Sequence, residues 1–453
     1  MKDLAVKNKL FSIVLALITI VIVLLPFHAF LTVWAASLFG HYTLFRLWKE
    51  FLVLFCGLFV IYLFFIDKKV RQKILKDKLV WVILAYVILD FIVGGVAFFT
   101  HKVTTKALAY GLLDDLRFLA FFIICWAVAI CRPELTKRWQ KMIIWPALIV
   151  VLFGLLEMSV LPINFLAHFG YSAKTIPPYQ TINNNIHFVR ILSTLRGANP
   201  LGAYLILPIS AIAVLFVKSF KSWNWAKALF FIGSIVVLVG SYSRSAWIGA
   251  FLSCVVLALT LISKSFIKRF KVPIIVTGIV ILGLVISSFV LLGKSTRFQD
   301  IVFHTQAHSA SPVSSDQAHI SALITGIKQV ELKPLGRGPG SSGPASFYNH
   351  DGVPRVPENY FLEVGEESGF LGMALFIAIN ILVGYRLWQR RDADFALTLF
   401  VSLVGITFVN LLLLAWTDDT LSYIWWGLAG LAMAIPPAGK VYVAKPKSIA
   451  TTK

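Results

Sequence analysis

Two arginines stand directly before an apolar stretch, where a positive charge is costly. Arg190 and Arg196 lie six residues apart, and the apolar stretch begins near residue 201. A charge at the edge of a membrane needs an anion or a lipid headgroup to compensate it. A guanidinium group offers several fixed donors and stays charged at ordinary pH, so it suits phosphate. The pair predicts a phosphate-binding site, with snorkelling to lipid headgroups as the alternative.

Two further arginines lie in polar breaks. Arg244 is in a short polar turn between two apolar stretches, beside Trp247. It can anchor the chain at the membrane interface or point inward beside the other arginines, and the sequence leaves both open. Arg337 lies in the glycine-rich stretch Pro334-Leu-Gly-Arg-Gly-Pro-Gly340. No Lys-Ser/Thr follows as a nucleotide-binding loop requires, so a plain turn is the simpler interpretation.

Glu358 is the candidate for proton transfer. It follows Pro357 at the start of a helical pattern and close to an expected membrane surface. A carboxylate partly removed from water has a raised pKa and can act as a general base. The alternative is an acidic side chain that stabilises the N-terminus of a helix.

Other titratable side chains are expected to have structural roles. Glu363, Glu366 and Glu367 are expected on a solvated helix face, since no His is interleaved with them as in a metal site. Asp418 and Asp419 stand among aromatic residues, which suits either sugar binding or, preferably, a helix cap at the interface. The histidines of the second half lack ligand spacing and are expected in polar loop contacts: His304, His308, His319 and His350.

The composition shows what must position these residues. Hydrophobic residues make up 58% of the 453 and charged residues 14%, and the mean hydropathy is +0.82. A soluble domain carries about 25% charged residues, so this chain cannot coat a globule of its size. The composition therefore predicts an all-α integral membrane protein in the lipid bilayer. The net charge of +21 indicates topology rather than a nucleic-acid partner.

About twelve stretches approach the roughly 20 apolar residues that a transmembrane helix needs. They lie near residues 11–25, 51–66, 79–99, 116–131, 142–161, 201–217, 226–242, 245–262, 272–292, 369–388, 395–415 and 421–437. Residues 29–48 are apolar but carry His41 and Arg46, which favours a short or re-entrant outer helix over a thirteenth span.

Lys and Arg gather in alternate loops, near residues 68–78, 132–141, 218–227, 264–271 and 386–391. The positive-inside rule therefore places both termini in the cytoplasm. The two long loops, 162–200 and 293–368, fall on the opposite face, and the second separates spans nine and ten. The chain thus divides into residues 1–292, the large extracytoplasmic loop 293–368, and residues 369–453. Within that loop, residues 318–330 show the apolar spacing of an amphipathic helix.

The end of the large loop carries a recognisable spacing. Asn359 is followed by nine residues and then Gly369-Phe-Leu-Gly372. This resembles the signature of the bacterial O-antigen ligases and related surface-polysaccharide polymerases, in which His-Asn, nine residues and Gly-x-x-Gly end the large outer loop. Glu358 stands here in place of the His.

Three other stretches are similar to the same family in their order and membrane side. They are Arg190 with Asn199-Pro200 before a span, the Ser-Arg-Ser-Ala-Trp turn at Arg244, and Pro-Leu-Gly-x-Gly at 334–338. The resemblance covers roughly residues 185–375 in motifs and the whole chain in topology.

The resemblance implies roles for particular residues. It implies that Arg190, Arg196 and Arg244, with Arg337 as a fourth candidate, bind a lipid diphosphate, and that Glu358 takes a proton from an acceptor hydroxyl. Supporting roles fall to Asn199, Asn359 and His319. No metal and no cofactor are implied, because the arginines supply the positive charge.

The sequence therefore predicts a glycosyltransferase of the bacterial plasma membrane with an extracytoplasmic active face. Its donor would be a polyprenyl-diphosphate-linked oligosaccharide and its acceptor a glycan hydroxyl, as in polymerisation of a surface polysaccharide. Glu358 in place of the His favours a polymerase over a ligase onto a lipid or cell-wall acceptor. A flippase or transporter of lipid-linked sugars is the alternative from another class, although transporters concentrate polar residues at the midplane rather than at one surface.

Overall fold

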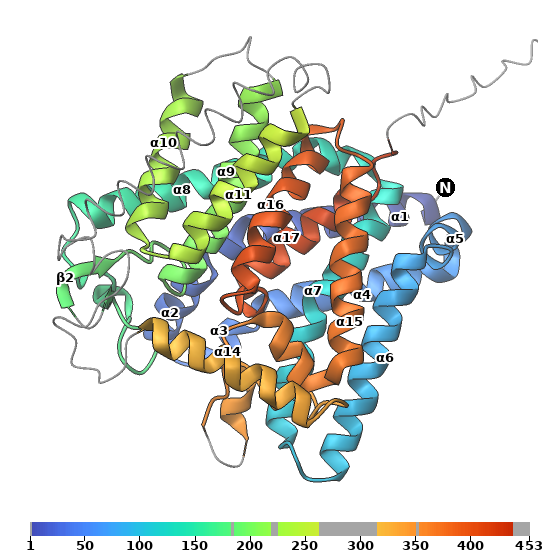
Figure 1. Cartoon of the computed structure of the whole chain (residues 1–453). Coiled ribbons are helices and arrows are strands. Elements are labelled where there is room, and N and C mark those ends of the chain that lie inside the picture. The colour runs from blue at the N-terminus through green and yellow to red at the C-terminus, as the bar shows by residue number, and fades with distance from the viewer. Residues whose placement is uncertain (1, 183–184, 219–224, 262–314, 350–352, 438–453) are drawn as a thin grey trace, which may run out of the picture.

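The long apolar stretches of the sequence fold as helices that pack side by side in the computed structural model (Figure 1). The structure describes residues 2–182, 185–218, 225–261, 315–349 and 353–437. Its first helices are α1 (Lys2–Leu24), α2 (His28–Phe39), α3 (Tyr42–Arg46), α4 (Trp48–Ile66), α5 (Lys68–Leu75), α6 (Lys78–Phe99), α7 (Thr105–Cys131) and α8 (Trp139–Ser159). They are followed by α9 (Ala198–Lys218), α10 (Trp225–Gly240), α11 (Arg244–Leu261), α14 (Ser315–Leu332), α15 (Tyr360–Trp388), α16 (Asp394–Asn410) and α17 (Asp419–Ala432).

Eleven of the twelve predicted spans fall on these helices, and the ninth, 272–292, lies outside the described residues. In the part of the chain that the structure describes, six helices are long and apolar enough to cross a membrane. Three more, α10, α11 and α16, are apolar but shorter. An all-α membrane architecture is confirmed, and the number of twelve spans stays a prediction.

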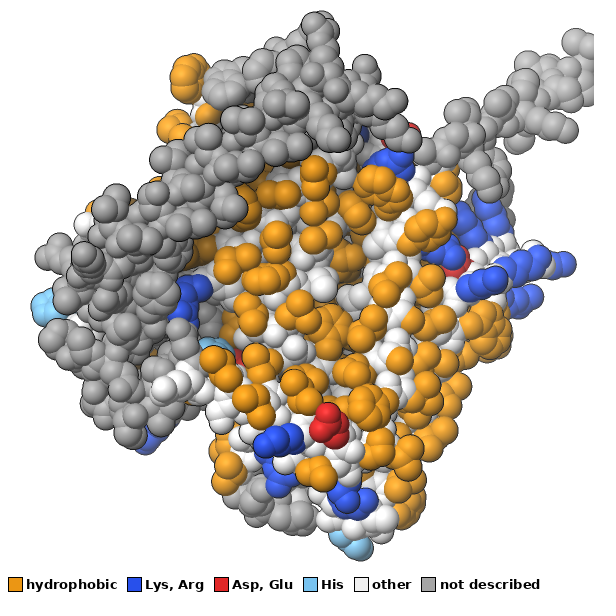
Figure 2. Space-filling model, viewed as in Figure 1, with side chains coloured by type: hydrophobic (Ala, Val, Ile, Leu, Met, Phe, Trp, Pro, Cys, Tyr) orange, Lys and Arg blue, Asp and Glu red, His pale blue; other side chains and the backbone are white. Residues whose placement is uncertain are grey.

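The centre and the outside of the bundle differ in burial. α17 is buried along its whole length and packs against α7, while α11 packs against α9 and α16. The outer helices α4 and α6 keep large hydrophobic side chains exposed, such as Phe65 and Phe91. Figure 2 shows hydrophobic side chains across the middle of one face, with Lys and Arg gathered toward its edges. This distribution suits a protein surrounded by lipid.

The basic loops and the predicted site residues lie at opposite ends of the helices. α9 begins beside Asn199 and ends at Lys218, whose Nζ lies 3.1 Å from an Asp394 carboxylate oxygen. α15 begins after Asn359, and Arg386 near its other end pairs with Asp77 at 2.5 Å. The same end of the bundle therefore carries the candidate chemistry of both halves of the chain.

The segment predicted as a short outer helix, residues 29–48, folds as α2 and α3. The predicted amphipathic helix is also present, as α14. It lies across the lower part of the bundle in Figure 1 and packs against α15. Its apolar side chains Ile320, Ile324 and Ile327 are about half exposed, so that face is free to contact lipid.

One element was absent from the all-α prediction. Strands β1 (Gln180–Ile182) and β2 (Asn185–Arg190) pair in antiparallel fashion, and Gln180 pairs with Arg190. The backbone N–H of Ile191 then donates to the carbonyl of Gly240 at 3.2 Å. This strand pair thereby fixes Arg190 against the turn between α10 and α11.

Candidate active site

Arg190 is held by two neutral oxygen atoms. Its Nε donates to the backbone carbonyl of Ser241 at 2.9 Å, and its Nη2 donates to Oδ1 of Asn199 at 2.6 Å. Asn199 lies in the first turn of α9, and Ser241 directly follows α10. The Arg190 and Asn199 of one predicted motif are therefore joined to the Ser-Arg-Ser turn of another.

The electrostatics of Arg190 favour an anion. Burial lowers the pKa of Arg190 to about 10, and the positive charge of Arg244 acts in the same direction. The guanidinium is still protonated at neutral pH, but its charge is held at a cost. A bound anion between Arg190 and Arg244 would offset both the burial and the repulsion.

A cavity of about 210 Å³, the interhelical cavity, brings other predicted residues together. Arg196, Asn199 and Glu358 all line it. Since Asn199 also binds Arg190, that arginine lies one hydrogen bond behind the cavity wall. The other lining residues are Pro200, Ala203, Pro344, Val356, Leu413, Leu414, Ala415, Thr417, Asp418 and Leu421.

Glu358 lies beside a histidine. Nδ1 of His319, on α14, lies 3.4 Å from Oε2 of Glu358, and both side chains are about one third exposed. The two residues come from opposite ends of the described part of the large loop. They form a carboxylate and imidazole pair that can accept and hold a proton at the wall of the interhelical cavity.

Unusual backbone conformations gather around these residues. Glu358, Ser193 and Tyr242 have φ values of 55°, 52° and 50°, in the left-handed region that non-glycine residues seldom adopt. Ser193 lies between the two predicted arginines, and Tyr242 precedes Arg244. Each such residue costs on the order of 1–3 kcal/mol, and such strain is concentrated at functional sites.

The spacing of nine residues after Asn359 is the length of one short helix. The side chain of Asn359 caps α15 by accepting from the backbone N–H of Leu362 at 3.0 Å. At Gly369, φ is 72° and ψ is −175°, which breaks α15 into two helical parts. A Cβ atom at Gly369 would lie 2.3 Å from the carbonyl oxygen of Pro334, so only glycine fits.

The glycine-rich loop fills this break in α15. Its backbone N–H groups at Arg337 and Gly338 donate to the freed carbonyls of Glu366 and Glu367, at 2.9 and 2.8 Å. The Glu367 carboxylate also accepts from the N–H groups of Gly340 and Ser342 at 2.7 and 3.2 Å. These N–H groups of the loop are therefore used by the chain's own carbonyl and carboxylate groups, which agrees with the plain turn that the sequence favoured.

The prediction of a solvated face for Glu363, Glu366 and Glu367 is wrong. The three residues are 4%, 5% and 2% exposed. The glycine-rich loop covers them, and the carboxylate of Glu367 satisfies donors of that loop. The sequence shows the three carboxylates, but it does not show that the glycine-rich loop covers them and donates hydrogen bonds to one of them.

Arg337 does not join the other arginines at the interhelical cavity. Its Nη2 donates to Gln329 on α14, and it lines a separate, larger groove beneath that helix. The predicted residues thus form three overlapping groups. Arg190 lies with Asn199 and Arg244. Arg196, Asn199 and Glu358 line the interhelical cavity, and Glu358 also pairs with His319.

Comparison with known protein families finds a match to part of this site. Residues 228–377 match the family model of the O-antigen ligases. This part of the chain, about a third of its length, is similar to the O-antigen ligases. No curated protein matches the chain. The match agrees with the resemblance drawn from the motifs and supports glycan transfer of the O-antigen ligase type.

The O-antigen ligase segment contains Arg244, the glycine-rich loop, Glu358 and the break in α15. Arg190 and Arg196 precede it in the sequence but meet it in space, through Ser241 and the interhelical cavity. The site is therefore assembled from both sides of the boundary of the matched segment.

A buried ionic network beside the O-antigen ligase site escaped the sequence analysis. A carboxylate oxygen of Asp419 lies 2.9 Å from Nζ of Lys49, and another lies 2.5 Å from Nη2 of Arg117. Arg117 also pairs with Asp114 at 3.0 Å, and His28 lies 3.5 Å from Asp419. Lys49 and Arg117 within apolar helices were the available signal, since buried charges in a membrane require partners.

The neighbouring Asp418 has the role that its sequence favoured. Its side chain caps α17 by accepting from the N–H groups of Thr420 and Leu421 at 3.1 and 3.2 Å. Across the described ranges, no three His, Cys, Asp or Glu side chains gather as ligands of a metal would.

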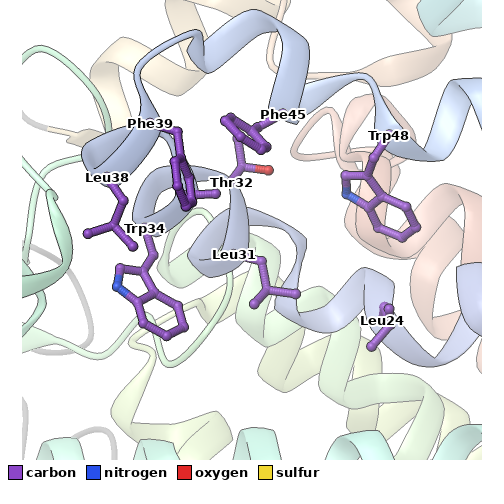
Figure 3. A pocket seen from close by; sticks show the side chains of 9 residues that line it. Leu24, Leu31, Thr32, Trp34, Leu38, Phe39, Phe45 and Trp48 are labelled. Carbon is purple, nitrogen blue, oxygen red and sulfur yellow. The ribbon is translucent and has the colours of Figure 1, made fainter.

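An apolar groove lies close to the site, among the first four helices. The groove, of about 420 Å³, is formed by side chains of α1 to α4 that include Leu31, Phe39 and Phe45 (Figure 3). Thr32 lines both this groove and a small polar cavity that also contains Arg46. The polar cavity in turn shares Arg196 and Asp418 with the interhelical cavity.

The three hollows therefore adjoin one another in a fixed order. The apolar groove comes first, the polar cavity with Arg46 and Arg196 second, and the interhelical cavity with Glu358 third. The structure adds Arg46 as a candidate site residue. In the sequence, Arg46 served only as evidence against a thirteenth transmembrane span.

Proposed function

We propose that this chain transfers an oligosaccharide from a polyprenyl diphosphate to a hydroxyl group of a glycan acceptor, as a polymerase of a surface polysaccharide. The observation that carries the proposal is the interhelical cavity, where Arg196 and Glu358 face one volume and Arg190 lies behind Asn199. A lipid-linked donor has an apolar tail, an anionic centre and a polar glycan. The apolar groove, the arginines and the interhelical cavity offer matching surfaces in that order.

The arginines act on the leaving group. When the acceptor oxygen attacks the anomeric carbon, the bond from that carbon to the diphosphate oxygen breaks, and its electron pair stays on the diphosphate. Arg190, Arg196 and Arg244 stabilise the negative charge that develops there. Because Arg190 has only neutral partners among its hydrogen bonds, its charge is not already cancelled by a carboxylate.

Glu358 receives the proton. The attacking hydroxyl becomes a better nucleophile as its proton moves to the carboxylate, and His319 at 3.4 Å orients that carboxylate or shares the proton. The family uses a His at this place, and here the imidazole comes instead from α14. Glu358 and His319 together therefore provide a carboxylate that accepts the proton and an imidazole beside it.

The reaction is assigned to the outer face of the plasma membrane. Lys218 and Arg386 lie at the ends of α9 and α15 that are remote from the site. Basic loops are retained in the cytoplasm, so the opposite end faces outward and both termini face inward.

The test is a transfer assay with purified protein in lipid nanodiscs and a polyprenyl-diphosphate oligosaccharide serving as both donor and acceptor. Mass spectrometry follows the elongated glycan and the released polyprenyl diphosphate. Glu358→Gln keeps the shape but removes the basicity, so transfer is expected to fall by roughly 10²–10⁴. Glu331→Gln, on the exposed side of α14, is the matched control and is expected to retain the wild-type rate.

The alternatives give different results in the same assay. Wild-type transfer by Glu358→Gln would remove this residue as the base. A wild-type protein that moves the lipid across the bilayer without elongating the glycan would instead be a flippase. Elongation only after addition of a lipid or cell-wall acceptor would identify a ligase.

A further inference from the structure

The groove that contains Arg337 is larger than the interhelical cavity and has no role in the function proposed so far. It encloses about 670 Å³ between α14, the segment 355–357 and α15. The lining residues are Ala318, Ser321, Ala322, Thr325, Gly326, Gln329, Arg337, Arg355, Val356, Pro357 and Glu366. We call this hollow the α14 groove.

One wall of the α14 groove is a single helix face of small and polar side chains. Ala318, Ala322 and Gln329, with the hydroxyl-bearing Ser321 and Thr325, recur at the spacing of one face of a helix. Small side chains leave room, and the hydroxyl and amide groups match the hydroxyl groups of a sugar. The same helix carries its exposed isoleucines outside this face, so the groove wall is not simply an unpartnered apolar surface.

The opposite wall carries two arginines. The backbone of Arg355 is fixed by a bond from its N–H to the Ser346 hydroxyl at 2.8 Å. Burial lowers the pKa of Arg337, and the charge of Arg355 lowers it further, while Glu366 opposes them. Two guanidinium groups and the carboxylate of Glu366 therefore line the α14 groove.

The α14 groove adjoins the site at Glu358. Val356 lines both the α14 groove and the interhelical cavity. Glu358, two residues further on, lines the interhelical cavity, and His319 is on the helix that walls the groove. The glutamate and histidine pair therefore stands where the two volumes meet, which is where an acceptor hydroxyl must be activated.

We propose that the α14 groove binds the acceptor glycan through an acidic group of its sugars, which Arg337 and Arg355 recognise. This inference rests on the proposed function, since it assigns the donor to the interhelical cavity and the acceptor to the groove beside it. Carboxylate and phosphate groups share the chemistry that two guanidinium groups select. A neutral glycan offers these guanidinium groups no charged partner and is therefore the weaker ligand.

Binding of three oligosaccharides to the full chain in nanodiscs tests the inference. A hyaluronan hexasaccharide presents carboxylates, a mannose 6-phosphate oligosaccharide presents phosphates, and chitohexaose is neutral. We expect one of the acidic probes to bind at least tenfold more tightly than chitohexaose. Arg337→Gln is expected to reduce that affinity by roughly 10- to 100-fold, the loss typical of a hydrogen bond to a charged group.

Two variants separate recognition from general charge and from misfolding. Lys328→Gln removes a positive charge from the exposed side of the same helix and is expected to leave the affinity unchanged. Ala322→Trp fills the groove and is expected to abolish binding while the thermal melting temperature stays within a few degrees of wild type. Equal binding of all three probes, or equal losses in Arg337→Gln and Lys328→Gln, would overturn the inference.

Donor binding is measured in the same samples with a polyprenyl diphosphate. Retained donor binding with no preference for an acidic probe means that the groove inference fails while the proposed function stands. If the wild-type protein does not bind the polyprenyl diphosphate, the proposed function itself fails. The two failures are therefore distinguishable.

Discussion

Two neighbouring regions of the molecule hold cations away from water, and the partners of those cations differ. In the network around Asp419, Lys49 and Arg117 each have a carboxylate within 3 Å. Around Asn199, within the described ranges, the half-buried Arg190 donates only to an amide oxygen and a carbonyl oxygen. Asp418 and Arg196 stand between the two regions, since both line the polar cavity and the interhelical cavity.

The difference separates charges that hold the fold from charges that are available to a ligand. A buried cation with a carboxylate partner contributes little attraction for a further anion, and removing the partner is costly. A cation with neutral partners keeps its field, which a diphosphate can use. The ionic network therefore stabilises α4, α7 and α17, and the arginine region is the place where an anion lowers the free energy.

The largest effect is expected on removal of the shared carboxylate. Asp419→Asn leaves Lys49 and Arg117 without their common charge partner in a buried place, and this costs about 3–5 kcal/mol of stability. We expect a large drop in the yield of monodisperse protein and in its melting temperature, measured by size-exclusion chromatography after heating.

The matched control is Asp394→Asn, which breaks the partly exposed pair with Lys218. Such a pair contributes about 0–1 kcal/mol, so the melting temperature should scarcely move. Equal stability of both variants would show that the network of Asp419 does not hold the helices together.

The opposite result is expected for Arg190→Gln. The variant removes a charge that is partly buried and repelled by Arg244, so stability should stay at the wild-type level or rise slightly. Affinity for a polyprenyl diphosphate should fall by roughly 10- to 100-fold, the cost of a charged hydrogen bond. Titration with the lipid, followed by thermal shift, measures both quantities.

Arg132→Gln serves as the control because this partly exposed arginine directly follows α7, at the end of that helix remote from the site. A loss of stability in Arg190→Gln comparable to that of Asp419→Asn would contradict the distinction between the two regions.

The sequence predicted the features that depend on local pattern. Apolar length located eleven of the helices, and the charge of the loops separated the two ends of the bundle. The spacing from Asn359 to Gly369 also had a local cause, because one residue caps a helix and the other breaks it. Such signals lie within a few turns of one another and need no knowledge of tertiary contacts.

Features that depend on distant segments were not predictable in the same way. Glu367 was expected in solvent because nothing in its own helix shows that residues 340–342 cross over it. Lys49 and Asp419 are separated by most of the chain, and no periodicity joins them. The sequence offers no signal that separates Arg337 from the other arginines, yet in the folded structure its side chain lines a different groove.

The smallest expected effects come from a substitution that gives Arg190 a carboxylate partner. Asn199→Asp is nearly isosteric and places a carboxylate oxygen where Oδ1 now accepts from Arg190 at 2.6 Å. A charge-assisted bond is about twice as strong as a neutral one, and a negative charge is also favourable in the first turn of α9. We expect a gain of about 1 kcal/mol in stability.

The same substitution should weaken the site. The added carboxylate cancels part of the field that attracts a diphosphate, so donor affinity is expected to fall by about tenfold, equivalent to about 1.4 kcal/mol. Asn185→Asp is the control, because it adds the same charge to the start of β2, where the side chain accepts from the backbone N–H of His187. A stability gain without a loss of donor affinity would show that the charge of Arg190 is not used for the diphosphate. Stability and affinity moving in opposite directions only in Asn199→Asp would show that the charge of Arg190 serves diphosphate binding rather than stability.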